Sequence, residues 1–226
     1  MKTILIILGM TLSLCASAQD DNVRQQVLIE TSLGNIRVEL YNETPKHRDN
    51  FLKLVKEGFY DGILWHRVIK NFMIQTGDST TRHAKPGEFV GLHDPDYTIP
   101  AEIVYPKFFH KRGALAAARE GDDTNPERAS SSSQFYIVYG KTYSTMSLQF
   151  LQEKIRENTN GRYEMTEDIQ AYYRKNGGTP HLDGQYTVFG EVTEGLDVVR
   201  QIQQVFTDDY DRPVDDIRII RAVVIE

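Results

Sequence analysis

Two neighbouring segments place one arginine and one glutamine among apolar and aromatic residues. Residues 65–69 read WHRVI and residues 72–78 read FMIQTGD, in which Arg67 stands directly before an apolar pair and Gln75 directly after an apolar and aromatic stretch. An arginine stays charged at any ordinary pH and carries several directed N–H donors. Taken alone, Arg67 would be interpreted as a solvent-exposed strand residue. Whether it has a catalytic role depends on the residues around it.

Composition argues against several other kinds of chemistry. Cys15 is the only cysteine, and the six histidines show no metal-ligand spacing. His66 is therefore interpreted as structural, and no metal or cofactor is expected. The serine run 130–133 lacks the glycines of a nucleophile elbow and is predicted to be a flexible loop. With a formal net charge of −6, the chain offers no basic surface for nucleic acid.

The segments that would position Arg67 and Gln75 are short strands. Ile36, Val38 and Leu40 alternate with polar residues, which is typical of a strand. Similar runs, separated by turn residues, recur along the chain. The predicted strands are 27–30, 35–40, 64–69, 72–75, 113–118, 135–138, 186–192 and 217–225. Many short strands with few helices predict a β-barrel or sandwich.

Helical patterns occur in three places. Thr44 and Pro45 are typical of a helix start, and a second helix is predicted at 196–205. Residues 139–178 are predicted to be a mostly helical insertion, with Thr166 as an N-cap. The insertion could be a structural elaboration or a lid or docking surface over the site, and the sequence leaves both open.

The N-terminus has the pattern of a secretory signal peptide. Lys2 precedes an apolar run at 4–14 and the small residues of 16–18, and the run is about half the ~20 residues of a membrane-spanning helix. We expect cleavage after Ala18, a flexible lead-in at 19–26, and one domain at 27–226 without a membrane span. Export, most simply to a periplasm, is expected; lipid attachment at Cys15 is the alternative.

The chain resembles the cyclophilin family of peptidyl-prolyl cis-trans isomerases. Besides residues 65–69 and 72–78, further fragments match in the family's order. These further fragments number four, namely 113–118 (GALAAA), 133–137 (SQFYI), 182–184 (LDG) and 188–190 (VFG), so that five match in all when 65–78 is counted as one, with similarity extending from 27 to 226 outside the insertion. The resemblance implies a mainly β fold, namely a closed eight-stranded antiparallel barrel capped by two helices, here with the helical insertion.

The resemblance also implies roles for individual residues. Arg67 would donate a hydrogen bond to the prolyl nitrogen, and Gln75 would bond the substrate backbone. Gln134 would support the site from its strand, and Ala118 and Arg119 would offer backbone groups to the residues before proline. The residues implied to contact substrate are Phe72, Met73, Ala118, Arg119, Gln134, Tyr136, His181, Leu182 and Tyr186.

Four of these positions depart from the commoner family pattern. Arg119 stands in place of asparagine, Tyr136 in place of phenylalanine, His181 in place of tryptophan, and Tyr186 in place of histidine. The tryptophan is linked to cyclosporin binding, so sensitivity to that compound is not implied. Tyr136 adds a hydroxyl at the expected proline pocket.

The predicted function is acceleration of X-Pro bond isomerisation in exported proteins that are folding. Prolyl isomerisation takes tens to hundreds of seconds unaided, which makes it a limiting step in folding. The alternative is a non-catalytic module that holds proline-containing segments, which would need the apolar pocket but not Arg67. The expected partners are such segments of unfolded or flexible proteins, and the protein is expected to be a monomer.

Overall fold

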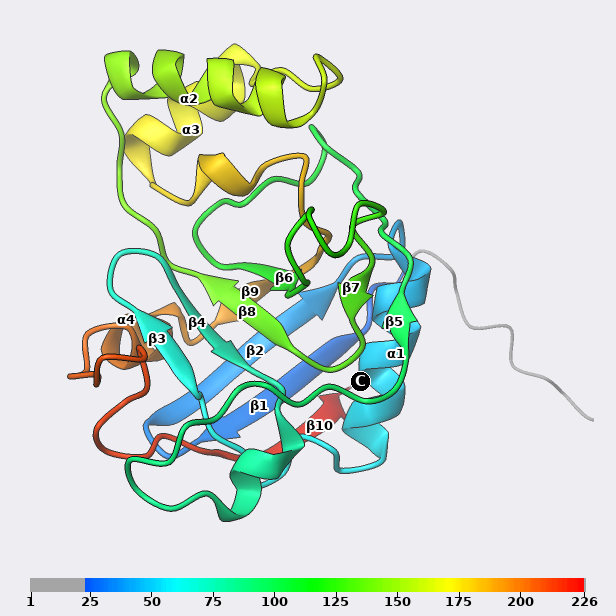
Figure 1. Cartoon of the computed structure of the whole chain (residues 1–226), viewed down its shortest axis with the longest axis vertical. Coiled ribbons are helices and arrows are strands. Elements are labelled where there is room, and N and C mark those ends of the chain that lie inside the picture. The colour runs from blue at the N-terminus through cyan, green and yellow to red at the C-terminus, as the bar shows by residue number, and fades with distance from the viewer. Residues whose placement is uncertain (1–22, 226) are drawn as a thin grey trace, which may run out of the picture.

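One antiparallel sheet organises the chain, for which the computed structural model describes residues 23–225 (Figure 1). Its eight strands, in sheet order, are β10 (Ile219–Ile225), β1 (Gln26–Thr31), β2 (Gly34–Leu40), β9 (Val188–Glu194), β6 (Ala114–Ala117), β8 (Phe135–Val138), β4 (Met73–Thr76) and β3 (Arg67–Ile69). A separate pair joins β5 (Thr98–Ile99) to β7 (Ser130–Ser131). The predicted strands are confirmed, with ends displaced by up to three residues.

The sheet is strongly curled, but the prediction of a closed barrel is wrong. β10 and β3 are the two edges of the sheet and do not pair with each other as strands. The predicted strand 64–69 is regular only from Arg67, and the residues before it approach β10 through the isolated bridge of Leu64 with Arg218. Single backbone hydrogen bonds, such as the one from Trp65 N–H to Ile217 O at 2.9 Å, connect the segments next to the two edge strands. The curled sheet is thus half closed.

Four α-helices accompany the sheet. They are α1 (Pro45–Lys56), α2 (Thr145–Asn158), α3 (Glu167–Lys175) and α4 (Leu196–Ile202), with two short 3-10 turns, η1 (Ser79–His83) and η2 (Pro180–Leu182). Figure 1 shows α2 and α3 together at one end of the molecule, apart from α1 and α4. The predicted helices are present, and the 139–178 segment contains both α2 and α3. The Thr166 side chain caps α3 by accepting from the Ile169 N–H, as predicted.

Helix α1 begins at Pro45 as predicted, but its N-terminus is capped by a different residue. The Thr44 side chain makes no capping hydrogen bond and instead donates to the Tyr41 carbonyl, 3.3 Å away. The Glu102 carboxylate accepts from the Lys46 and His47 backbone N–H groups at 3.1 and 3.0 Å. A carboxylate suits this position because it complements the unpaired N–H groups and the positive end of the helix dipole.

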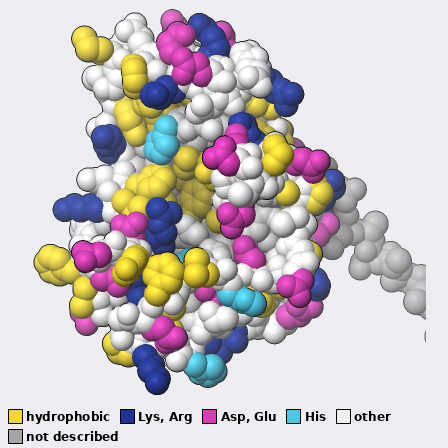
Figure 2. Space-filling view, viewed as in Figure 1, with side chains coloured by type: hydrophobic (Ala, Val, Ile, Leu, Met, Phe, Trp, Pro, Cys, Tyr) yellow, Lys and Arg dark blue, Asp and Glu magenta, His cyan; other side chains and the backbone are white. Residues whose placement is uncertain are grey.

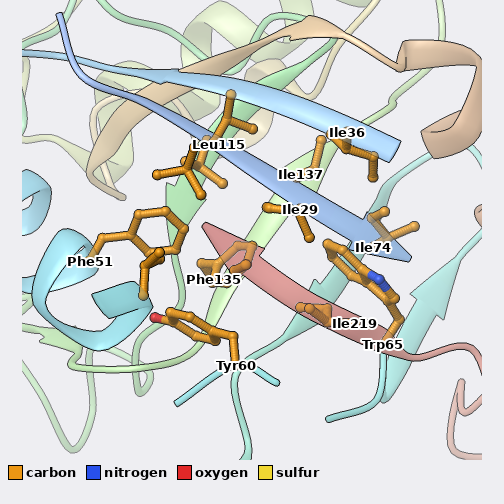
Figure 3. Packing of buried hydrophobic residues seen from close by; sticks show 14 of the residues in the cluster. Ile29, Ile36, Phe51, Tyr60, Trp65, Ile74, Leu115, Phe135, Ile137 and Ile219 are labelled. Carbon is orange, nitrogen blue, oxygen red and sulfur yellow. The ribbon is translucent and has the colours of Figure 1, made fainter. Parts of the chain in front are cut away.

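The main core fills the concave side of the sheet (Figure 3). Alternate strand residues point into it, because successive side chains on a strand face opposite sides. Aromatic rings from the segments beside the sheet complete it. Its members include Ile29, Ile36, Phe51, Tyr60, Trp65, Ile74, Leu115, Phe135, Ile137 and Ile219. Phe135 meets the rings of Phe51, Tyr60 and Trp65 edge to face at 5.2–6.0 Å, a favoured aromatic geometry.

The N-terminal predictions are only partly within the described residues. The predicted signal peptide 1–18 and residues 19–22 of the lead-in lie outside them. Residues 23–26 of that lead-in lie within them, where Arg24 pairs with Glu39 at 2.9 Å and β1 begins at Gln26. Between residues 23 and 225, the structure contains no helix with the length and apolar character needed to cross a bilayer.

Candidate active site

The strand register places the predicted catalytic residues in one row on the convex side of the sheet. Arg67 on β3 pairs with Gln75 on β4, Gln75 pairs with Tyr136 on β8, and Tyr136 pairs with Ala116 on β6. Directly paired residues share a face, so all four side chains lie on the same side. The intervening residues Ile74 and Ile137 point into the main core instead. The methyl group of Ala116 is small, which leaves room above the row.

A pocket of about 160 Å³ opens above this row. Every residue that lines it belongs to the set named from the sequence. They are Arg67, Phe72, Met73, Gln75, Ala118, Arg119, Tyr136, Leu182 and Tyr186. Figure 2 shows hydrophobic side chains gathered in the middle of this face of the molecule. The floor is apolar, since Met73 and Tyr136 are buried within the cluster beneath it.

Arg67 lies at the rim of the pocket and remains accessible. Its side chain is 43% exposed, and Nε lies 3.4 Å from a carboxylate oxygen of Asp211. Its Nη1 donates to Gln75 Oε1, also over 3.4 Å. Both contacts are long for hydrogen bonds to a charged group, so neither saturates the guanidinium. The sequence did not indicate Asp211, which lies 144 positions away along the chain.

Gln75 is oriented by Gln134, one of the two predicted site residues that do not line the pocket. Gln75 Nε2 donates to Gln134 Oε1 at 2.9 Å, which turns the carbonyl end of Gln75 toward Arg67. Gln134 Nε2 in turn donates to the Gly91 and His93 carbonyls, each 3.2 Å away. Gln134, the residue before β8, thus holds the Gln75 side chain in place.

The serine run beside Gln134 consists of strand β7 and a buried bend at 132–133, not the flexible loop expected. Ser130, Ser132 and Ser133 are at most 3% exposed. The Ser131 hydroxyl oxygen accepts the Gln134 N–H at 2.7 Å and the same hydroxyl bonds Asp94. Gly77, at φ +114°, passes so close that a Cβ there would lie 2.3 Å from the Ser133 carbonyl oxygen. These contacts hold the start of β8 in place.

The opposite end of the pocket is formed by residues 118, 119 and 186. The Ala118 N–H and C=O are already bonded to Gln134 O and Ser131 N, so the backbone groups left for a ligand there are those of Arg119. The Arg119 guanidinium is buried: it donates to the Gln185 carbonyl, pairs with Asp122 at 2.6 Å and lies over the Tyr186 ring. Replacing asparagine by arginine here therefore stabilises the wall and leaves the backbone free.

His181 is the other predicted residue outside the lining. Its ring lies 5.3 Å from that of Phe72, so it supports a lining residue from the side of η2. Partial desolvation lowers the pKa of His181 below its usual value, which favours the neutral ring near pH 7. It therefore extends the apolar rim and does not add a charge.

Two other residues behind the site are histidines. His66 is buried beneath Gly91, and burial lowers its pKa to about 4, consistent with the structural role predicted. His110 is within 2.9 Å of the Tyr136 hydroxyl and was not predicted as a site residue. No sequence spacing links His110 to Tyr136; the departure from phenylalanine at 136 was the one indication that a buried partner must exist.

Comparison with known proteins agrees with this geometry. Residues 26–224 match the family described as cyclophilin type peptidyl-prolyl cis-trans isomerase/CLD. The chain belongs to this family and is a peptidyl-prolyl cis-trans isomerase by that membership. The match spans the insertion as well as the sheet.

Individual relatives show the same relationship. The chain is 34% identical over 202 residues to the peptidyl-prolyl cis-trans isomerase ppi1 of Schizosaccharomyces pombe, covering 88% of this chain and 98% of the relative. It is 30% identical over 211 residues to the peptidyl-prolyl cis-trans isomerase CYP18-2 of Arabidopsis thaliana, with 93% and 99% covered. A crystal structure of a cyclophilin-type isomerase from Cryptosporidium parvum is similar at a TM-score of 0.63 and 25% identity, covering 90% and 99%.

Proposed function

We propose that this isomerase works by donating a hydrogen bond from Arg67 to the nitrogen of a proline held in the 160 Å³ pocket. The barrier to rotation, ~18–20 kcal/mol, exists because the amide nitrogen lone pair is delocalised into the carbonyl. In the twisted transition state the lone pair is localised on nitrogen. A donor aimed at that nitrogen therefore binds the transition state better than either planar ground state.

The observation that carries this proposal is an accessible guanidinium beside an apolar slot. A charged hydrogen bond contributes about 1.5–3 kcal/mol, which corresponds to roughly ten- to a few-hundredfold in rate. The slot contributes in the same direction, because the planar amide is more charge-separated than the twisted one and is less stable in apolar surroundings. A module that only bound proline would need Met73 and Tyr136 but not Arg67, so the arrangement favours catalysis.

The test compares wild type with Arg67→Ala by exchange NMR on a short X-Pro peptide. We expect the rate enhancement to fall at least tenfold, while the affinity for the peptide changes much less, since the slot is intact. Arg221→Ala removes an exposed arginine on β10 that pairs with Glu30, and serves as the matched control. Equal activity of wild type and Arg67→Ala would exclude Arg67 as the catalytic donor.

We further propose that the substrates are exported proteins and that the enzyme itself is exported, most simply to a periplasm. The support is the charged, apolar and small-residue pattern of residues 2–18. Mass spectrometry of the protein recovered from its native compartment should find Gln19 as the first residue. A lipid-modified Cys15 at the N-terminus would replace this proposal with membrane anchoring.

A further inference from the structure

A buried chain of hydrogen bonds joins the pocket floor to the helical insertion. The Tyr136 hydroxyl lies 2.9 Å from His110 Nε2, and His110 Nδ1 lies 3.0 Å from Asp183 Oδ1. The Tyr173 hydroxyl on α3 donates to Asp183 Oδ2 over 2.8 Å. All four residues are at most 4% exposed. The chain therefore connects α3 to Tyr136 through the segment next to Leu182.

The donors and acceptors along this chain can run in one direction. Asp183 accepts from the His110 backbone N–H at 2.8 Å as well as from the imidazole and the Tyr173 hydroxyl. When Nδ1–H donates to the carboxylate, a neutral imidazole presents its Nε2 lone pair to Tyr136. Burial raises the pKa of Tyr136 and of Tyr173 well above the usual value, so both hydroxyls keep their protons. With the tautomer that carries its proton on Nδ1, His110 accepts from the Tyr136 hydroxyl at Nε2.

This direction matters for the pocket because it fixes where the Tyr136 hydroxyl points. The hydroxyl is directed away from the pocket, toward His110, and the pocket receives only the ring. A buried hydroxyl without an acceptor would be costly and would turn toward the nearest polar group. A phenylalanine at this position would need no such partner. The tyrosine hydroxyl therefore needs His110 as a hydrogen-bond partner, and His110 in turn is bonded to Asp183.

The insertion controls the far end of the chain. Tyr173 is enclosed by a separate apolar cluster that includes Tyr105, Leu148, Ile155 and Ile169. Its ring packs against Phe109 and Tyr143 at 5.5 and 6.3 Å. The position of its hydroxyl is therefore set by the packing of α2 and α3, not by the sheet that carries Tyr136.

We propose that Tyr173 is a positioning residue for the proline pocket, acting through Asp183 and His110 on the orientation of Tyr136. The 139–178 insertion thereby determines the shape of a pocket that it does not line. This inference rests on the proposed function, since its readout is the binding and turnover of an X-Pro peptide. Tyr173 itself touches no substrate.

The experiment is a double-mutant cycle of Tyr173→Phe and Tyr136→Phe, with kcat and KM measured on an X-Pro peptide. Tyr173→Phe keeps the ring and removes only the donor to Asp183. We expect KM to rise roughly three- to tenfold, with kcat changed less than about twofold. In the Tyr136→Phe background the same substitution should change KM less than about twofold, because no hydroxyl is left to orient.

A purely structural role predicts a different result, namely an equal effect of Tyr173→Phe in both backgrounds. That result, or no effect in either, would overturn the inference. Tyr172→Phe, on the same helix, is the matched control and should leave KM unchanged. If a thermal melt shows that Tyr173→Phe does not fold, His110→Gln in the same two backgrounds applies the same criterion from the middle of the chain.

Failure of the proposed function would be recognised separately. If wild type neither binds nor isomerises the peptide, the proposed function is wrong and the cycle has no signal. If wild type is active and the cycle shows no coupling, only the role of Tyr173 is wrong.

Discussion

The two faces of strands β4, β6 and β8 differ in what their side chains do, although the residues alternate along the same backbone. On the concave face Ile74, Leu115 and Ile137 are fully buried in the main core. On the convex face Gln75 and Tyr136 lie in the pocket lining. Each strand thus separates a layer buried in the core from a layer that faces the pocket, because successive side chains point to opposite sides.

The comparison predicts that substitutions on the two faces act on different quantities. Concave-face substitutions should change the free energy of unfolding and leave the activity of each folded molecule intact. Convex-face substitutions such as Arg67→Ala should do the reverse. The following predictions test this separation.

The largest expected effect is on the concave face. Ile137→Ala creates a cavity in a fully buried position and should lower the free energy of unfolding by about 3 kcal/mol, measured by urea denaturation. Activity per folded molecule should stay within about twofold of wild type. Ile220→Ala, on an isoleucine that is 54% exposed, is the control and should change stability by less than about 0.5 kcal/mol. A large loss of activity per folded Ile137→Ala molecule would break the separation.

An intermediate effect concerns the layer behind the site, at His66. Its folded-state pKa of about 4 lies below the unfolded value of 6.5, so between these values the unfolded chain binds more protons. Stability is therefore fully present above pH 6.5 and is lost as the pH falls toward 4. Between pH 7 and pH 5, His66 should lower the free energy of unfolding by about 2 kcal/mol.

The measurement is urea denaturation at several pH values. His66→Gln should flatten the dependence between pH 7 and pH 5 relative to wild type, with the remaining slope assigned to other groups such as His47, whose pKa burial also lowers. An unchanged slope in His66→Gln would show that His66 is not held in its neutral form by burial. The layer behind the site would then not show the desolvation expected of the protein core.

The smallest expected effect is at the counter-ion of Arg67. Asp211→Asn removes a charge from an ion pair whose two side chains are each about 42% exposed, and such pairs contribute about 0–1 kcal/mol. Asparagine also tolerates the backbone there, which has φ +64°. Turnover should fall less than about threefold. Asp209→Asn is the control. If Asp211→Asn lost as much turnover as Arg67→Ala, Asp211 would take part in the reaction itself.

Much of the site was predictable because it follows from short-range pattern and register. Gln75 and Arg67 belong to two adjacent strands joined by a tight turn, so their pairing is set locally. Tyr136 and Gln134 share a side of one strand by the period of two. The remaining lining residues were implied by the family resemblance and not by strand pattern.

The unpredicted features all depend on contacts between distant segments. Glu102 caps α1 from 56 positions away, and the Thr44 side chain, which local pattern favoured, does not. The serine run looked flexible by composition but is buried against Gly77. A closed barrel was expected from the family resemblance. Residues 64–66, which would have to pair with β10 to close it, are not a regular strand.

The sequence by itself determined the strands and the helices, because side-chain period and turn residues are local properties, and the family resemblance indicated the residues that line the pocket. Only the tertiary structure decided that the Tyr136 hydroxyl would be bonded to His110 and that Asp183 would join it to Tyr173. The physical reason is that a buried polar atom takes whichever partner packing brings within hydrogen-bond distance. No spacing along the chain encodes that distance.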